Sequence, residues 1–362
     1  MYKKLIRPIL FQMDSESAHN VVLKLATLGN NLVLNKLVKG VFSFEHKSLE
    51  QNFLNLEIKN PLGLAAGFDK SLIALNFWYA LGLGFVECGN ITALPSMGNP
   101  KPRIFRLVED QALVNRIGLA NIGADAMQER LQKLQLNLPF GINIAKTHDP
   151  KILGDDAIKD FLYTFNALYE FGKYVTLNIS CPNTTEGKTF EEPKALDALL
   201  LEIMKAKSKF AKQNPILVKI SPDINFADLE NILSVCEQHK INGYVLTNTT
   251  KNRDNLKTST EILSSIGNGG VSGKPIAKRS TEIIRFVYKL LKRPCIMGLG
   301  GVDSAESAYE KIKAGASLVQ IYTGLIYKGP FLIKQINKGL VELLKKDGFK
   351  NISEAVGVEC NI

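Results

Sequence analysis

From about residue 60 onward, short apolar runs alternate with longer stretches whose apolar residues recur at helical spacing. The runs are rich in Val, Ile and Leu, and polar residues or glycines stand at their C-terminal ends. They are PLGLAAGFDK, GFVECGNIT, FGINIAK, YVTLNIS, ILVKIS, GYVLTNTT, CIMGLGGVD and SLVQIYTG. Alternating strands and helices form parallel sheets with buried strands. About eight such units predict an α/β fold, a (β/α)8 barrel of the TIM type.

A doubly wound parallel sheet is the alternative fold. Such sheets bind dinucleotides through a GxGxxG motif in the first strand-to-helix turn. No GxGxxG motif opens the first unit here, and polar residues follow all of the apolar runs. The barrel is therefore the better prediction, and its chemistry should gather where the strands end.

The first 45 residues follow another pattern, with three short amphipathic stripes. The stripes cover residues 5–10, 18–25 and 34–42. We predict three short helices, and we divide the chain into an N-terminal helical region, residues 1–45, and a barrel, residues 46–362.

Polar residues set the limits of the second predicted helix. Asp14 or Ser15 can cap its start, and Gly29 with Asn30 can end it. Packing against the barrel is one interpretation of these helices. An interfacial lid is the other, because basic residues outnumber acidic ones in this region, as suits anionic lipid head groups.

The composition, with 45% hydrophobic and 22% charged residues, is typical of a folded protein with a substantial core. No run of about 18 apolar residues predicts a membrane-spanning helix, and no signal peptide is recognisable. The formal charge is +10, but the lysines are scattered, so we expect no nucleic-acid partner. Five widely spaced cysteines without a CxxC pair indicate a reducing cytoplasm and no metal site.

Lysines and asparagines recur at the predicted strand ends. Lys70, Lys146 and Lys219 each follow an apolar run, and together they could surround a central pocket. A cation there would stabilise negative charge on an electron-accepting ring or a phosphate. The asparagines in question are Asn115, Asn143, Asn178, Asn183 and Asn248. A single Asn is usually a turn or cap residue, but five indicate a planar ligand with many donors and acceptors.

Glycines cluster near the last strand ends, in GNGGVSGKP, GLGGVDS and IYTGLIYKGP. In barrels, the loops after the seventh and eighth strands often bind phosphate through backbone amides and a helix start. A glycine pair alone indicates only a tight turn, but three segments favour a phosphate-bearing ligand.

Cys181 stands in NISCPNTT directly after a predicted strand. A buried structural cysteine is the ordinary interpretation. The loop position instead favours a reactive thiol that can accept a proton when its anion is stabilised. No Ser/His/Asp order and no HExxH motif competes with it.

The motifs NPLGLAAGFDK, KPRIFRL, NISCPNT, TNTT, GGVSGKP, GLGGVDS and GASLVQIYTG together resemble dihydroorotate dehydrogenase over nearly the whole chain. The resemblance implies FMN above the strand ends and oxidation of dihydroorotate to orotate in pyrimidine synthesis. It places around FMN the residues Ala65, Ala66, Gly67, Lys70, Asn90, Asn143, Asn178, Lys219, Thr247, Gly270, Gly301, Tyr322 and Thr323. It assigns to the substrate Lys70, Asn115, Asn178, Asn183, Asn248 and Thr249.

The same resemblance makes Cys181 the base. It would take the proton from C5 of dihydroorotate while a hydride passes from C6 to N5 of the flavin, and Lys219 would stabilise the reduced flavin. The opening LFQMDSESAH resembles the membrane-associated, quinone-using class, in which His19 and Arg103 would lie at the quinone tunnel. This implies peripheral attachment to the cytoplasmic side of the cell membrane.

Three features depart from that class. Its base is normally serine, whereas cysteine is typical of the soluble class that reduces fumarate or NAD. Asn90 replaces a usual threonine, and Leu119 and Ala120 replace a usual phenylalanine and asparagine. A soluble-acceptor enzyme, or a flavin-binding paralogue with altered substrate or no turnover, are therefore the alternatives to the quinone enzyme.

Overall fold

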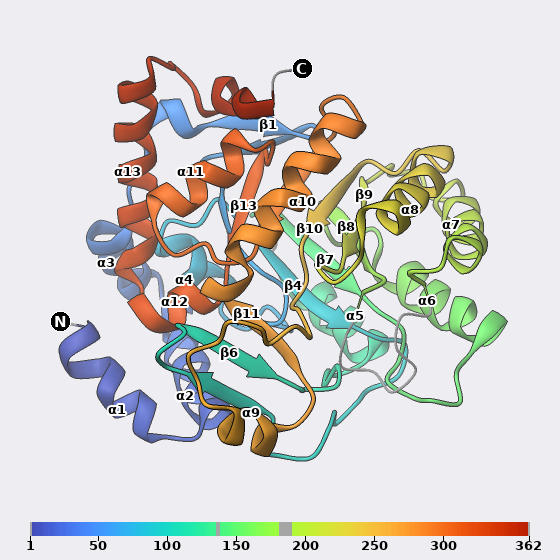
Figure 1. Ribbon diagram of the computed structural model, residues 1–362, viewed down its shortest axis with the longest axis horizontal. Helices are drawn as coiled ribbons and strands as arrows, with labels where there is room; N and C mark the ends of the chain where they lie inside the picture. Colours follow the sequence, from blue (N-terminus) through green and yellow to red (C-terminus); the bar gives the residue numbers. More distant parts are fainter. Residues whose placement is uncertain (1, 135–137, 181–189, 361–362) are drawn as a thin grey trace.

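A closed barrel of eight parallel strands forms the centre of the molecule (Figure 1). The computed structural model describes residues 2–134, 138–180 and 190–360. The barrel strands are β3 (Leu62–Leu64), β4 (Phe85–Ile91), β7 (Phe140–Ile144), β8 (Tyr174–Asn178), β9 (Ile216–Ile220), β10 (Gly243–Leu246), β12 (Ile296–Leu299) and β13 (Leu318–Ile321). They coincide with the eight apolar runs in chain order, so the barrel prediction is confirmed and the doubly wound alternative is wrong.

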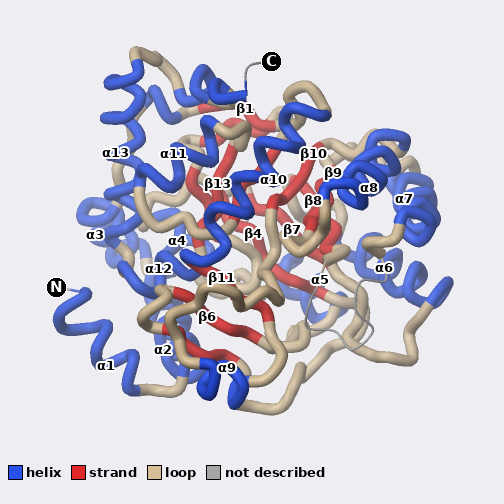
Figure 2. Tube along the Cα trace, viewed as in Figure 1, coloured by secondary structure: helices blue, strands red, loops and turns tan. Residues whose placement is uncertain are grey.

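Helices surround the barrel on the outside (Figure 2). They are α4 (Leu75–Ala80), α5 (Ala124–Lys133), α6 (Gly154–Leu168), α7 (Pro193–Lys207), α8 (Phe226–Gln238), α10 (Ala277–Leu290), α11 (Ala305–Lys313), α12 (Thr323–Lys328) and α13 (Phe331–Asp347). A further helix, α9 (Thr260–Ile266), packs away from the barrel, beside a small sheet described below. The main core lies between these helices and the strands, while Phe85, Tyr174, Leu217, Met297 and Leu318 fill the inside of the barrel. Burial on both faces explains why the strand sequences are continuously apolar.

Two small sheets, which the sequence patterns did not predict, lie outside the barrel. The hairpin β1 (Gln51–Phe53) and β2 (Leu56–Ile58) packs Phe53 and Ile58 against the side chains inside the barrel. The strands β5 (Ile104–Leu107), β6 (Ala112–Asn115) and β11 (Gly270–Gly273) form an antiparallel sheet in the order β11, β6, β5. Short 3-10 helices are formed by η3 (Lys47–Leu49), η4 (Lys274–Ile276), η5 (Ile352–Ala355) and η6 (Val358–Cys360).

The N-terminal region forms η1 (Tyr2–Ile6, a π-helix), α1 (Arg7–Gln12), α2 (Ser15–Ala26) and α3 (Leu32–Phe42). The predicted cap is confirmed at Asp14, whose carboxylate accepts a hydrogen bond from the Ser17 amide at 2.9 Å. Beyond α2 the chain makes the 3-10 turn η2 (Thr27–Asn30). Gly29 is needed there because a Cβ would lie 2.8 Å from the Phe77 Cβ.

These helices pack against the barrel but leave large apolar side chains exposed. The Tyr2 hydroxyl donates to the Ile326 carbonyl at 2.6 Å, and the Lys334 ammonium donates to the Val41 carbonyl at 2.8 Å. The exposed side chains include Leu5, Ile9, Leu25, Leu28, Val33 and Leu37. Among the described residues, no single helix has the length and apolarity needed to cross a bilayer; only α2 and α3 taken together, with a sharp bend, pass that test.

Candidate active site

A cavity opens at the C-terminal ends of the barrel strands, beside the sheet of β5, β6 and β11. Most of the residues expected at the flavin and the substrate line it. These are Ala65, Ala66, Gly67, Lys70, Asn90, Asn115, Asn178, Lys219, Thr247, Asn248, Thr249, Gly301, Tyr322 and Thr323. We call this space the polar cavity. The ends of most barrel strands therefore meet at one place, as is typical of the fold class.

Four of the expected residues are placed differently. Cys181 and Asn183 lie outside the described residues. Asn143 is fully buried inside the barrel and is not among the lining residues. Gly270 is a strand residue of β11 whose carbonyl accepts a hydrogen bond from the Asn115 side chain at 3.3 Å. The role of each toward a ligand stays a prediction.

Lys146 does not join the other two strand-end lysines, and the expectation that it would is wrong. Its ammonium donates to the carbonyls of Thr147, Asp149 and Ile152 at 2.9–3.1 Å. The lysine thus closes the loop that follows β7. Lys219, by contrast, is buried and lines the polar cavity.

Asparagine side chains at neighbouring strand ends are linked to one another. Asn178, at the end of β8, donates through Nδ2 to the side-chain oxygen of Asn90. Asn248, after β10, donates to Asn178 Oδ1 at 3.3 Å and to the Ser180 carbonyl at 2.9 Å. These contacts hold the carboxamides in place at the cavity wall, as expected for side chains that orient a planar ligand.

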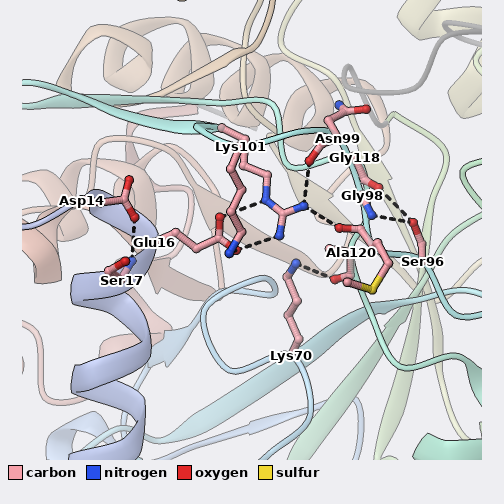
Figure 3. A network of polar contacts seen from close by, with 12 residues as sticks. Asp14, Glu16, Ser17, Lys70, Ser96, Gly98, Asn99, Lys101, Gly118 and Ala120 are labelled. Atoms are coloured by element: carbon pink, nitrogen blue, oxygen red, sulfur yellow. Dashed lines mark hydrogen bonds and ion pairs between the residues drawn. The ribbon is translucent and has the colours of Figure 1, made fainter.

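Lys70 lies between this cavity and a network that ties the N-terminal helices to the barrel (Figure 3). Its ammonium donates to the Ala120 carbonyl at 2.7 Å. Ala120 and its neighbour Leu119 occupy the positions at which the sequence departs from the resembling class. The carbonyl of residue 120 serves as the acceptor, so this contact does not depend on the missing asparagine side chain.

Arg103 is the centre of that network, because it contacts Glu16, Met97 and Asn99. Its guanidinium makes a two-pronged ion pair with Glu16 of α2, at 2.7 and 2.9 Å, and donates to the carbonyls of Met97 and Asn99. Arg103, followed by Lys101, holds the pKa of Glu16 below its usual value, against the opposing effect of burial. The arginine therefore attaches helix α2 to the loop before β5.

Glycines and hydroxyl-bearing residues, which we call the glycine cradle, line the polar cavity at the ends of β11, β12 and β13. Gly301 has φ +74°, and a Cβ there would lie 2.4 Å from the Ala277 Cβ, so only glycine fits. The hydroxyls of Ser272 and Thr323 lie 2.8 Å apart on the same side of the cavity. Ser272, Gly273 and Gly300 also line the cavity. They were not named individually, but they stand in the glycine segments GGVSGKP and GLGGVDS, which predicted a phosphate-bearing ligand.

A second cavity, which we call the apolar cavity, lies under the N-terminal helices. Phe11, Val22, Phe77, Leu325 and Pro330 are among its lining residues, together with His19 and Arg106. Arg103, expected here, does not line it, because its guanidinium is engaged with Glu16. Arg106 instead turns toward α1 and donates to the carbonyls of Leu10, Phe11 and Met13 at 2.8–3.3 Å.

His19 is neutral at physiological pH. Burial, and then the nearby Lys70 ammonium, lowers its pKa to about 4. Its ring contacts the Phe68 ring edge-on, with the centroids 5.0 Å apart. The apolar cavity therefore contains an uncharged imidazole.

The two cavities share a wall made of Ile104, Leu113 and Tyr322. Burial raises the pKa of Tyr322 to about 12, so its hydroxyl stays protonated. Among the described residues, no group of three His, Cys, Asp or Glu side chains could hold a metal ion. The arrangement can thus hold two organic ligands close together on opposite sides of a thin wall.

These features define the class of protein. A (β/α)8 barrel with amide and ammonium groups at the strand ends and a glycine cradle after the last strands is typical of an enzyme that binds a phosphate-bearing ring ligand. The family model described as Dihydroorotate dehydrogenase matches residues 48–344. The chain belongs to the dihydroorotate dehydrogenase family.

Similar proteins come from distant organisms. A protein of Natronomonas pharaonis named Dihydroorotate dehydrogenase (quinone) is 40% identical over 356 residues, which are 98% of this chain and 99% of that protein. A protein of Christiangramia forsetii with the same name is 41% identical over 347 residues, 94% of this chain and 99% of that one. The crystal structure of DHODH from Eimeria tenella in complex with ferulenol superposes with a TM-score of 0.86 at 30% identity, and 96% of each chain is covered.

Proposed function

We propose that this protein oxidises dihydroorotate to orotate in pyrimidine synthesis, with FMN as its cofactor, and passes the electrons to a quinone. The observation that carries the proposal is the wall shared by a polar and an apolar cavity. A polar substrate and a hydrophobic acceptor can each reach a ring ligand at this wall from a different side. The names of the relatives support both the substrate and the acceptor.

The residues present fit FMN. The glycine cradle can receive a phosphate through backbone amides, because Gly300 and Gly301 line the polar cavity without side chains of their own. Lys219 and the buried oxygen of Gln320, which has no hydrogen-bond partner within the described chain, offer polar groups to the ring. When bound, FMN supplies a hydride acceptor.

The protein's own groups would then divide the remaining tasks. Asn178, Asn248 and Thr249 would orient the planar substrate through the linked carboxamides. Lys70 and Lys219 would stabilise negative charge on the ligands. Cys181 would accept the proton from C5 of dihydroorotate, as expected for a thiol placed after β8.

Quinone is the acceptor that the apolar cavity favours over fumarate or NAD. The described lining is mainly aliphatic and aromatic, and its histidine is neutral. Arg106 is the one charged side chain of the described lining, and its guanidinium already donates to carbonyls of the N-terminal helices. Charged soluble acceptors would therefore lose their hydration there and gain little in return. The N-terminal helices that cover this cavity also hold the exposed apolar side chains.

The identity of the electron acceptor can be tested by filling the apolar cavity with a larger side chain. Val22→Trp places a large ring in it, whereas Val21→Trp, on the same helix, changes a side chain that is 40% exposed and does not line it. We expect Val22→Trp to reduce quinone turnover about tenfold or more, while dihydroorotate still bleaches the yellow flavin at the normal rate. Val21→Trp should behave as the wild type. Normal quinone turnover in Val22→Trp, or efficient fumarate or NAD reduction by the wild type, would contradict the proposal.

We also propose peripheral attachment to the cytoplasmic side of the cell membrane through helices α1 to α3. Their exposed apolar side chains and basic residues suit a surface of anionic lipid. In a vesicle flotation assay with anionic phospholipid, Leu37→Glu should weaken binding several-fold. Leu201→Glu, at an exposed leucine of α7, is the matched control. Equal binding by both variants would count against the attachment.

A further inference from the structure

A carboxylate is buried in the middle of the barrel, and the mechanism above does not use it. Glu87 of β4 has no solvent exposure and interrupts the apolar run GFVECGNIT. It accepts hydrogen bonds from Asn143 Nδ2 at 2.7 Å, Gln320 Nε2 at 3.0 Å, the Tyr174 hydroxyl at 3.2 Å and the Thr176 hydroxyl at 3.3 Å. These donors come from β7, β8 and β13, so one carboxylate joins four strands of the barrel.

The carboxylate determines how two carboxamides are turned. An ionised carboxylate only accepts hydrogen bonds, whereas a carboxamide has a donating and an accepting end. Asn143 and Gln320 must therefore present their NH2 groups to Glu87, and their oxygens face the other way. Both of these oxygens are buried and have no hydrogen-bond partner within the described chain.

Buried unpartnered oxygens indicate a missing donor. Gln320 lines the polar cavity, so a ligand there can reach its side chain. Asn143 lies deeper, because it does not line the cavity. A ligand that satisfies the Gln320 oxygen must offer an N–H donor on the edge that faces the barrel interior. The imide N–H in the pyrimidine part of a flavin is such a donor.

We propose that Glu87 is a positioning residue that holds the Gln320 carboxamide with its oxygen ready to accept from the imide N–H of the flavin. This inference rests on the proposed function, because it assumes that the polar cavity holds FMN. Glu87 itself touches neither flavin nor substrate. It acts by preventing the Gln320 amide from rotating into the opposite orientation, which would offer its NH2 group to the ring.

The alternative is that Glu87 only stabilises the fold. The two proposals differ in what they expect of a flavin that lacks the donor. A purely structural carboxylate would affect all flavins alike, whereas an orienting carboxylate affects only flavins whose ring carries the N–H. The matched pair of probes is therefore FMN and FMN methylated at the imide nitrogen.

The experiment measures equilibrium binding of both flavins to the full-length protein by fluorescence. We expect the wild type to bind FMN about tenfold or more tightly than the methylated flavin. In Glu87→Gln, whose side chain has nearly the same shape, the ratio should fall to about threefold or less, because either amide orientation becomes possible. Thr176→Val removes one donor to Glu87, does not alter a lining residue, and should retain the wild-type ratio.

A second variant covers the case in which Glu87→Gln does not fold. Gln320→Met keeps the Glu87 carboxylate and removes the side-chain oxygen of Gln320. It should also bring the ratio of the affinities for FMN and methylated FMN closer to one. A wild-type ratio near one, or an unchanged ratio in Glu87→Gln or in Gln320→Met, would overturn the inference. If one of these ratios contradicts the inference while dihydroorotate still reduces the flavin bound to the wild type, only the role of Glu87 fails and the proposed function stands. If the wild type binds no flavin, the proposed function fails as well.

Discussion

The two cavities on either side of the Ile104, Leu113 and Tyr322 wall are built by opposite means. Strand ends carry the polar cavity, and side-chain hydrogen bonds hold its groups in fixed orientations, as in the chain from Asn248 through Asn178 to Asn90. Short helices cover the apolar cavity, and its described lining is held mainly by packing and by contacts from outside, such as the one between Glu16 and Arg103.

The difference follows from what each ligand needs. A small polar ring is recognised by directed hydrogen bonds, which require groups placed with little freedom. A hydrophobic acceptor gains most of its binding energy from burial, which has no direction. The barrel can therefore be rigid while the helical cover needs only to exclude water. Variants on one side should change one half of the reaction and leave the other unchanged.

The largest effect should come from the polar side. Cys181→Ala removes the proposed base, and we expect anaerobic reduction of the flavin by dihydroorotate to slow about a hundredfold or more. Reoxidation by a quinone should be unchanged, and FMN should stay bound. Rapid-mixing absorbance measures both halves, with Cys295→Ala as control. Unaffected reduction would show that the thiol is not the base.

An intermediate effect should come from weakening the attachment of helix α2, one of the N-terminal helices that cover the apolar cavity. Glu16→Gln removes the charge that pairs with Arg103, and a charge-assisted hydrogen bond contributes about 1.5–3 kcal/mol. We expect quinone reoxidation to slow several-fold and flavin reduction to stay normal. Glu45→Gln, which breaks an exposed pair with Lys39, should have little effect. If flavin reduction and quinone reoxidation slowed equally, the two cavities would not act independently.

The same pair has a pH dependence of known sign. The native pKa of Glu16 is lowered from 4.5, so the unfolded chain takes up the proton first as the pH falls. The stability contributed by the pair is fully present above about pH 4.5 and is lost as the pH falls through the native pKa. The difference in unfolding free energy between wild type and Glu16→Gln should therefore shrink in acid, which denaturant titrations at several pH values can measure.

The smallest effect concerns His19. Its native pKa of about 4 lies below the ordinary 6.5, so stability falls as the pH drops from about 6.5 to 4, where only the unfolded chain binds the proton. The His19→Asn variant should lack this part of the pH dependence. Nuclear magnetic resonance of the imidazole, assigned with that variant, should show a midpoint near pH 4. A midpoint near 6.5 would mean that the apolar cavity is wet.

The barrel could be predicted from the sequence because buried parallel strands leave a strong mark, a continuous apolar run with a polar end. The sheet of β5, β6 and β11 was missed because its short strands alternate weakly. Lys146 was misplaced for a related reason. A lysine after a strand looks the same whether the following loop leaves it in the cavity or folds back to bind it, as happens here.

The site was predictable where chemistry and position coincide, at strand ends, and not where a polar residue lies inside a strand. Glu87 and Gln320 both stand within apolar runs and were taken as part of the strand body. A charged or amide side chain in such a run needs a buried hydrogen-bond partner. The presence of Glu87 and Gln320 in two of these runs could therefore have predicted a polar contact inside the barrel. The separate domain boundary at residue 45 stays a prediction.

The number of residues in strand β5 is constrained, because the two faces of this strand contact different parts of the molecule. Ile104 and Arg106 stand on the face of β5 that turns to the apolar cavity, while Phe105 packs on the other face against the cluster of β6 and β11. Side chains alternate along a strand, so inserting or deleting one residue here would exchange the two faces. Such a change would turn the Phe105 ring into the apolar cavity and would also remove the hydrogen bonds from Arg106 that hold helix α1. Strand β5 can therefore accept changes of residue type but not of residue number.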